Sequence, residues 1–238
     1  MQEKLSTIEE KKIENYEIAE LIDPLKDIIK EMLPNIEKGE YDLIIGIDAS
    51  GRIPTLVIEK FIKHVYSKKG LIMPNVGFVA GKISRENAES RIKKWKPLKK
   101  VLIIEDTVAY GSSISGLCSA LSSLGIKFDI ATISLLNPAE VDEIKESLGA
   151  GNIFRGSEWG EPGIYGAHDL SGVAKQGEGE AHSVPYKPFY KDEFGDPRVE
   201  EEIQEELQER VNEARADANI VADHLIDWYE SRTKSDLS

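Results

Sequence analysis

Cysteine is almost absent from this sequence, because Cys118 is the only one among 238 residues. A single thiol excludes an intrachain disulfide and a cysteine-rich zinc site. Histidine is also scarce, with four residues spread over the chain. Their spacing matches neither a metal site nor a Ser-His-Asp or Cys-His catalytic arrangement, so these classes of chemistry are not indicated.

The sequence also lacks long apolar runs and an excess of positive charge. No apolar segment reaches the ~18 residues of a membrane span, and the charged start MQEKLSTIEEKK is unlike a secretory signal. Lys and Arg number 30 against 43 Asp and Glu, which gives a net charge of −13. An acidic surface repels phosphate backbones and anionic lipid, so we expect a cytoplasmic protein that binds neither nucleic acid nor membrane.

What is present is an alternation of strand-like and helix-like segments through the middle of the chain. Short apolar runs predict strands at 41–47, 71–81, 101–106 and 128–136, and segments of helical spacing lie between and after them. Strands that alternate with helices predict an α/β fold, with a mostly parallel sheet and helices on both of its faces. The 40% of hydrophobic residues is enough for a substantial core.

Four regions follow from the composition along the chain. We predict a helical N-terminal segment over 1–40, an α/β core over 41–157, an irregular Gly-, Pro- and aromatic-rich region over 158–196, and a long amphipathic helix over 197–238. Apolar residues recur along the last region at steps of three and four. Periodicity alone leaves two roles open for this stripe: packing on the protein's own core, or forming the interface of a homodimer.

The most informative loop follows the strand VLIIED. Glu105 and Asp106 offer carboxylate acceptors for the hydroxyls of a sugar diol. In the residues that follow, Gly111 allows backbone amides to approach an anion, and Ser112 and Ser113 add hydroxyls near the start of a helix. In a parallel sheet, ligands bind beyond the carboxyl ends of the strands. This loop therefore predicts a site for a sugar phosphate.

The segment VLIIEDTVAYGSS resembles the phosphoribosyl-diphosphate signature of type I phosphoribosyltransferases. The order of elements over 40–150 is similar to that family as well. The resemblance implies that Glu105 and Asp106 are the catalytic pair that holds the ribose hydroxyls. It also implies that Ala109, Tyr110, Gly111, Ser112 and Ser113 surround the 5′-phosphate. Tyr110 stands where the family usually has a small residue, and Ala109 argues against the hypoxanthine-guanine branch.

Two other segments acquire roles from the same resemblance. The turn after the first strand is expected to bind the diphosphate, with Arg52 supplying positive charge; it consists of Asp48, Ala49, Ser50, Gly51 and Arg52. A basic segment begins at Lys82 and continues to Lys100, where the family carries a mobile catalytic loop. Lys82 and Arg85 are the residues of this segment that we expect to contact ligand, while its other cations have the composition of a solvated surface.

The resemblance implies a glycosyltransferase of the pentosyl class that uses Mg²⁺. Its partners would be phosphoribosyl diphosphate and a small nucleobase-like acceptor, which Trp159 and Tyr165 in the irregular region would cover as an acceptor hood. An ordinary glycine-rich surface loop would account for the same aromatic residues. One alternative function is a non-catalytic sensor of phosphoribosyl diphosphate or a nucleotide, suggested by Tyr110 and the acidic C-terminal helix. Another is a different nucleotide-binding α/β domain, although neither G-x-G-x-x-G nor a P-loop motif is present.

Overall fold

The computed structural model describes residues 12–95, 97–135, 140–156, 168–175, 179, 181–183 and 200–235. Its centre is a five-stranded sheet in the order β2-β1-β3-β4-β5, in which all neighbouring strands are parallel. The strands are β1 (Leu43–Asp48), β2 (Asn75–Ala80), β3 (Lys100–Val108), β4 (Lys127–Leu135) and β5 (Ile153–Arg155). The three central strands β1, β3 and β4 are almost wholly buried, as expected for parallel strands covered on both faces.

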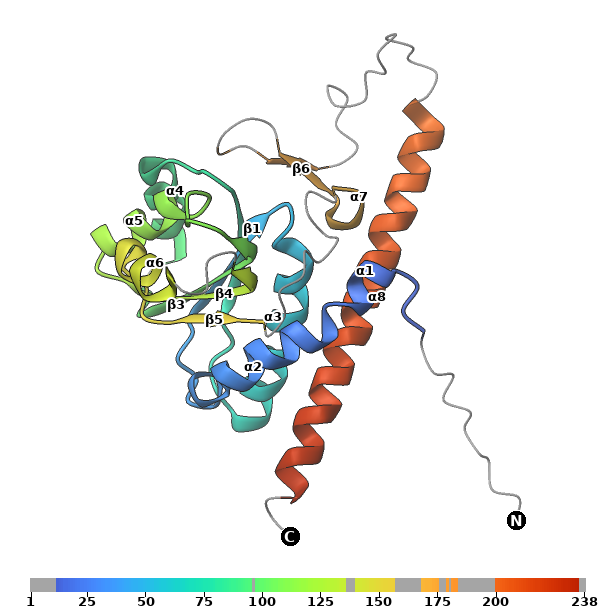
Figure 1. The fold of residues 1–238 in the computed structure, drawn as a ribbon, viewed down its shortest axis with the longest axis horizontal. Coiled ribbons are helices and arrows are strands. Elements are labelled where there is room, and N and C mark those ends of the chain that lie inside the picture. The colour runs from blue at the N-terminus through green and yellow to red at the C-terminus, as the bar shows by residue number, and fades with distance from the viewer. Residues whose placement is uncertain are drawn as a thin grey trace.

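Helices cover both faces of this sheet (Figure 1). One layer and its apolar core contain α1 (Tyr16–Ala19), α2 (Ile22–Glu37), α3 (Arg52–Lys69), α7 (His168–Ser171) and α8 (Glu200–Ser235). The opposite layer contains α4 (Arg85–Ile92), α5 (Ser115–Ser123) and α6 (Val141–Leu148), with the 3₁₀ turn η1 (Lys93–Trp95) after α4. The predicted α/β class, parallel sheet and two helical layers are therefore confirmed.

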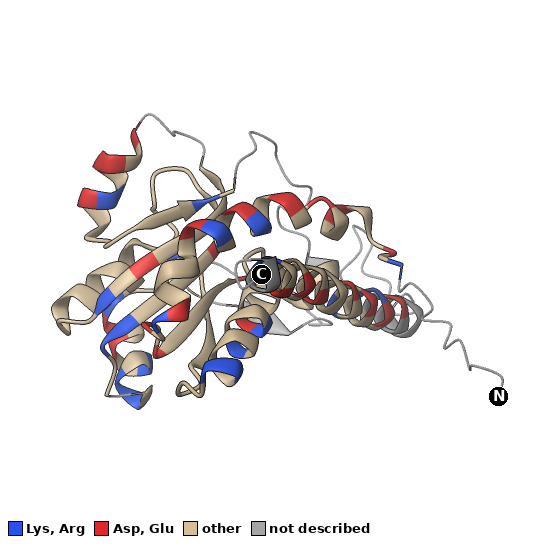
Figure 2. Ribbon diagram, turned by 90° about the horizontal axis from the view of Figure 1, so that it is seen from below, with Lys and Arg blue, Asp and Glu red and all other residues tan. Residues whose placement is uncertain are grey.

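The C-terminal helix α8 uses its apolar stripe within the same chain. It packs mainly on α3 and also contacts α1, α2 and α7. Acidic residues outnumber Lys and Arg along the helix (Figure 2). One of them, Asp217, ties the helix to the segment before α1, because it accepts hydrogen bonds from the backbone and side-chain nitrogens of Asn15 at 2.8 and 2.6 Å. The buried apolar residues of α8 are Val211, Ala214, Ala218, Val221, Ala222, Leu225 and Tyr229. Of the two roles left open by periodicity, packing on the protein's own core is the one this stretch adopts.

Regular structure extends into two segments where the sequence indicated loops. The irregular region predicted over 158–196 contains α7 and a two-stranded antiparallel hairpin, β6 (Val173–Lys175) with β7 (Ala181–Ser183). The basic segment predicted as a loop is helical over α4 and η1. Only Ala88 and Ile92 of α4 are buried, and so few apolar positions do not produce a recognisable helical period.

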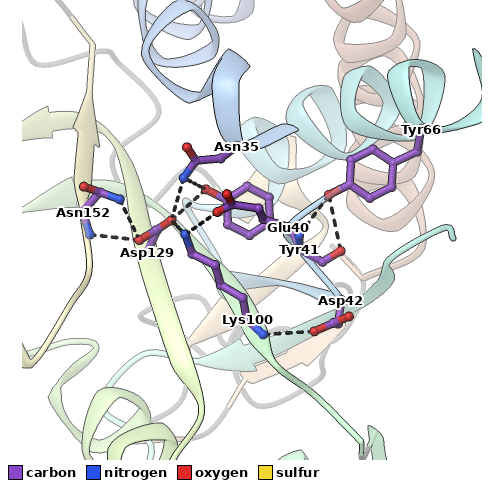
Figure 3. Close-up of polar contacts among 8 residues, drawn as sticks. All are labelled: Asn35, Glu40, Tyr41, Asp42, Tyr66, Lys100, Asp129 and Asn152. Carbon is purple, nitrogen blue, oxygen red and sulfur yellow. Dashed lines mark hydrogen bonds and ion pairs between the residues drawn. The ribbon is translucent and has the colours of Figure 1, made fainter. Parts of the chain in front are cut away.

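A buried polar cluster closes the amino-terminal edge of the sheet (Figure 3). Asp129 of β4 is 0% exposed, and its carboxylate forms an ion pair with Lys100 at 2.7 Å. The same carboxylate accepts hydrogen bonds from the hydroxyl of Tyr41 at 2.9 Å, from Asn35 at 3.3 Å, and from the backbone of Asn152 at 2.9 Å. A buried charge is tolerated only when it is paired and hydrogen-bonded, so this cluster holds the starts of several strands together.

Candidate functional site

From β1 the chain first adds β2 on one side of the sheet and then β3, β4 and β5 on the other side, so the strand order reverses between β1 and β3. These two strands separate at their carboxyl ends. Their pairing ends at Gly46 and Ile104. Beyond that point β1 continues beside β2 as far as Asp48, while β3 continues beside β4 as far as Val108. In open α/β sheets, ligands bind in the crevice at such a reversal. The loop after β1 and the loop after β3 are the two segments predicted from the sequence to bind ligand, and the structure brings them together here.

The first loop fits into the split between the two strands through Gly51. A Cβ atom on Gly51 would lie 2.7 Å from the carbonyl oxygen of Ile47 and 2.8 Å from that of Ile104. The peptide bond between Asp48 and Ala49, at the start of the same loop, is cis. Ser50 reaches across to β3 and donates a hydrogen bond from its hydroxyl to Asp106 Oδ1 at 2.6 Å. Glycine is required here because another chain segment occupies the space that a side chain would need.

Arg52, the predicted source of positive charge, is engaged within its own loop. Its Nε and Nη2 atoms donate to the two carboxylate oxygens of Asp48 at 2.8 and 3.0 Å. The guanidinium also lies over the ring of Phe78 on β2, at 4.1 Å from the ring centroid. A guanidinium has five N–H groups, so further donors exist beyond this pair. Its contact with a diphosphate stays a prediction. Phe78 is a neighbour of Arg52 that no sequence pattern indicated.

The two acids lie inside strand β3 rather than at its end, since the strand continues to Val108. Glu105 is 3% exposed and Asp106 is 5% exposed. Each carboxylate accepts a hydrogen bond from a serine of a different loop: Ser113 Oγ lies 2.9 Å from Glu105 Oε2, and Ser50 binds Asp106. The expected contacts of these acids with ribose hydroxyls remain a prediction.

The predicted phosphate loop, residues 109–113, forms a tight turn before α5. Gly111 has φ +74°, a conformation that favours glycine. A Cβ atom there would also lie 2.8 Å from the side chain of Leu148 on α6. Tyr110 is 73% exposed, and Ser112 is exposed as well. Helix α5 begins at Ser115, so the two predicted serines precede the helix rather than opening it.

The loop after β2 joins the other two at the same edge of the sheet. The backbone N–H of Lys82 donates to the carbonyl of Ser113 at 2.6 Å, and that of Gly81 donates to the carbonyl of Asp48 at 3.4 Å. Lys82 itself has φ +61°. Arg85, in contrast, is the first residue of α4 and forms an ion pair with Glu89 at 2.9 Å. The segment is thus helical from Arg85 onward, and the expected contacts of Lys82 and Arg85 with a ligand stay predictions.

Two glycines that the sequence did not single out complete these contacts. The backbone N–H of Gly179, between β6 and β7, donates to the carbonyl of Gly81 at 3.0 Å. Gly116 in α5 lies so close to the loop after β2 that a Cβ atom would be 1.9 Å from the carbonyl oxygen of Ile83. Neither belongs to a recognisable motif. Trp159 and Tyr165, the predicted acceptor hood, lie outside the described residues.

Among the residues that the structure describes, no three His, Cys, Asp or Glu side chains form a group that could hold a metal ion. No helix in the same part of the chain is both long enough and apolar enough to cross a membrane. No protein-family model matches the chain, and no curated protein matches it either.

Proposed function

We propose that this protein binds phosphoribosyl diphosphate at the split between β1 and β3 and transfers the phosphoribosyl group to a nucleobase-like acceptor. The observation that carries the proposal is the meeting of three loops at one edge of the sheet. Ser50 is hydrogen-bonded to Asp106, and the backbone of Lys82 to that of Ser113. Gly51 and Gly111 are the glycines in these loops at which a side chain would collide with its surroundings. Such an arrangement is suited to a ligand that carries phosphate at both ends of a sugar.

Each segment has a separate part in this proposal. The turn at 109–113 binds the 5′-phosphate through backbone amides and the exposed Ser112 hydroxyl. The loop at 48–52 binds the diphosphate, and Asp106 accepts a hydrogen bond from a ribose hydroxyl. During the transfer, the bond between ribose C1 and the diphosphate oxygen breaks and a bond from C1 to an acceptor nitrogen forms. The electron pair of the broken bond leaves with the diphosphate, and the proton that the acceptor nitrogen loses passes to the departing diphosphate or to water. The chain's contribution is to orient the sugar and to stabilise the departing negative charge.

Magnesium fits this site only in one way. Because the described residues do not form a cage of three ligating side chains, the ion would take most of its ligands from diphosphate and ribose oxygens. Mg²⁺ commonly binds in this manner, with one or two carboxylates and several substrate or water oxygens. Bound in that way, it would neutralise charge on the leaving diphosphate.

A sensor without catalytic activity is the second candidate, and the pairing of Arg52 with Asp48 favours it. Asp48 binds the Arg52 guanidinium through two hydrogen bonds, so the charge available to a leaving group is partly balanced. Binding without turnover, accompanied by a ligand-dependent change in oligomeric state, would support this function. If Tyr110→Thr raises turnover, the protein is an enzyme with an altered phosphate loop.

Calorimetric titration of phosphoribosyl diphosphate with Mg²⁺ at low salt tests the proposed site. We expect the wild type to bind and Asp106→Asn to lose most of the affinity. Asp223→Asn serves as a matched control, because Asp223 lies on α8 in a surface ion pair with Lys60. If the wild type does not bind, both the transferase and the sensor are excluded. If it binds, diphosphate release in an acceptor screen separates the two.

A further inference from the structure

The two adjacent acids of β3 are held from opposite faces of the sheet. Glu105 accepts its hydrogen bond from Ser113, in the turn that precedes α5. Asp106 accepts its hydrogen bond from Ser50, in the loop that precedes α3. Helices α5 and α3 belong to the two different layers. Successive side chains of a strand point to opposite faces, so the two carboxylates have different surroundings despite being neighbours in the sequence.

The surroundings of Cys118 support this placement of Glu105. Cys118 lies on α5 and is buried. Burial raises the pKa of its thiol to about 12, and the negative charge of Glu105 adds to the rise. The Glu105 carboxylate therefore faces the α5 layer, on the side away from the loop that holds Asp106.

In this arrangement the Ser113 hydroxyl donates its proton to the Glu105 carboxylate. An ionised carboxylate only accepts hydrogen bonds, and a serine hydroxyl has a single proton to donate. At 2.9 Å that proton goes to Glu105. Ser113 also accepts a hydrogen bond at its carbonyl oxygen from the backbone of Lys82. Both ends of this residue thus hold the turn in place, and its hydroxyl does not donate to a ligand.

We infer that the two acids have separate roles: Asp106 contacts the sugar, whereas Glu105 is a positioning residue that fixes the phosphate-binding turn through Ser113. This inference rests on the proposed function, since it assigns different roles to two residues of the same site. It differs from the expectation that both acids hold ribose hydroxyls. A ligand with a phosphate but no sugar therefore depends on Glu105 and Ser113 and is indifferent to Asp106.

The test compares two ligands that differ only in the sugar, ribose 5-phosphate and methyl phosphate. We expect Ser113→Ala and Glu105→Leu, each of which removes the hydrogen bond between the two side chains, to weaken both ligands by the same factor, about tenfold, which is the scale of one hydrogen bond to a charged group. The double variant should bind no more weakly than either single variant, because Glu105 acts through Ser113. Ser113→Thr keeps the hydroxyl and should bind as the wild type does. Asp106→Asn should weaken ribose 5-phosphate by about tenfold and leave methyl phosphate unchanged.

The inference is overturned if Glu105→Leu weakens ribose 5-phosphate alone, or if its effect adds to that of Ser113→Ala. Glu105 is buried, so its variant could fail to fold, which thermal unfolding would reveal. Ser113 is only partly buried, and unchanged binding of methyl phosphate by Ser113→Ala would by itself overturn the inference. A wild type that binds neither ligand is a different result, because it refutes the proposed function rather than the division of roles.

Discussion

Replacing Asp129 with Asn should destabilise the protein strongly, although the two side chains have the same shape. One carboxylate oxygen of Asp129 faces Lys100 at 2.7 Å and the hydroxyl of Tyr41 at 2.9 Å, and the other accepts from the backbone N–H of Asn152 at 2.9 Å. Every one of these neighbours is a donor. An amide turned either way would place its own NH₂ group against donors, and no orientation satisfies the cluster.

The expected loss in the free energy of unfolding depends on the burial of Asp129 and on Glu40, the partner of Lys100 that remains in the variant. Asp129 is 0% exposed, and removing one member of a buried ion pair costs about 3–5 kcal/mol. Burial by itself lowers the pKa of Lys100, yet the contacts with Asp129 and Glu40 raise it above its ordinary value overall. Because Glu40 stays at 2.8 Å from the Lys100 ammonium in the variant, we expect the lower end, about 3 kcal/mol. That is a large part of the 5–15 kcal/mol typical of a domain.

Urea unfolding of the wild type and the variant measures this difference. Asp223→Asn is a matched control, because Asp223 pairs with Lys60 at 2.7 Å but its side chain is 51% exposed. Surface pairs contribute about 0–1 kcal/mol, so the control should remain close to the wild type. If Asp129→Asn and Asp223→Asn lower the free energy of unfolding by the same small amount, the reasoning about the buried cluster is wrong.

Three further predictions concern other parts of the molecule. Gly116→Ala should lower stability by about 2 kcal/mol or more in urea unfolding, because its Cβ would lie 1.9 Å from the backbone oxygen of Ile83; a stabilised variant would contradict the packing of α5. Burial raises the pKa of Tyr66 to about 12 in the folded protein. The neutral Tyr66 side chain therefore contributes fully to the free energy of unfolding below pH ~10, and this contribution is lost as the pH rises towards 12. Tyr66→Phe should therefore show a shallower loss of stability over that range. Hydrogen bonds from Ser123 and then Arg85 lower the pKa of Glu89 to about 2, so stability present above pH ~4.5 is lost as the pH falls towards 2, and Glu89→Gln should flatten this decline.

The alternation of apolar runs and helical segments was sufficient to predict the class of fold. Residues 101–104 are apolar on both sides of their strand, as is typical of a parallel sheet that helices cover on both faces. Glycine and short polar side chains after the third strand were likewise enough to select the loop at 109–113, whereas the loop at 48–52 was selected through the resemblance to phosphoribosyltransferases. These are local features, because strand burial and turn chemistry depend on residues that are close in the sequence.

The helix α4 shows where such local features fail. Its residues other than Ala88 and Ile92 are polar or charged, so the apolar period that would reveal a helix is missing. Its stability comes from these two buried residues and from the cap of Ser84 on the backbone of Asn87. The hairpin of β6 and β7 is missed for a related reason, since strands of three residues are too short to display a period.

The sequence alone thus predicted the main strands and helices of the core, a mostly parallel sheet, and the loop at 109–113 as a segment with ligand-binding chemistry. Only the tertiary structure decided that the sheet reverses between β1 and β3, that Ser50 and Ser113 hold the two acids from opposite faces, and that α8 covers α3. Strand order and helix docking are set by contacts between residues far apart in the chain. A periodic pattern states which face of an element is apolar, but it does not state what will cover that face.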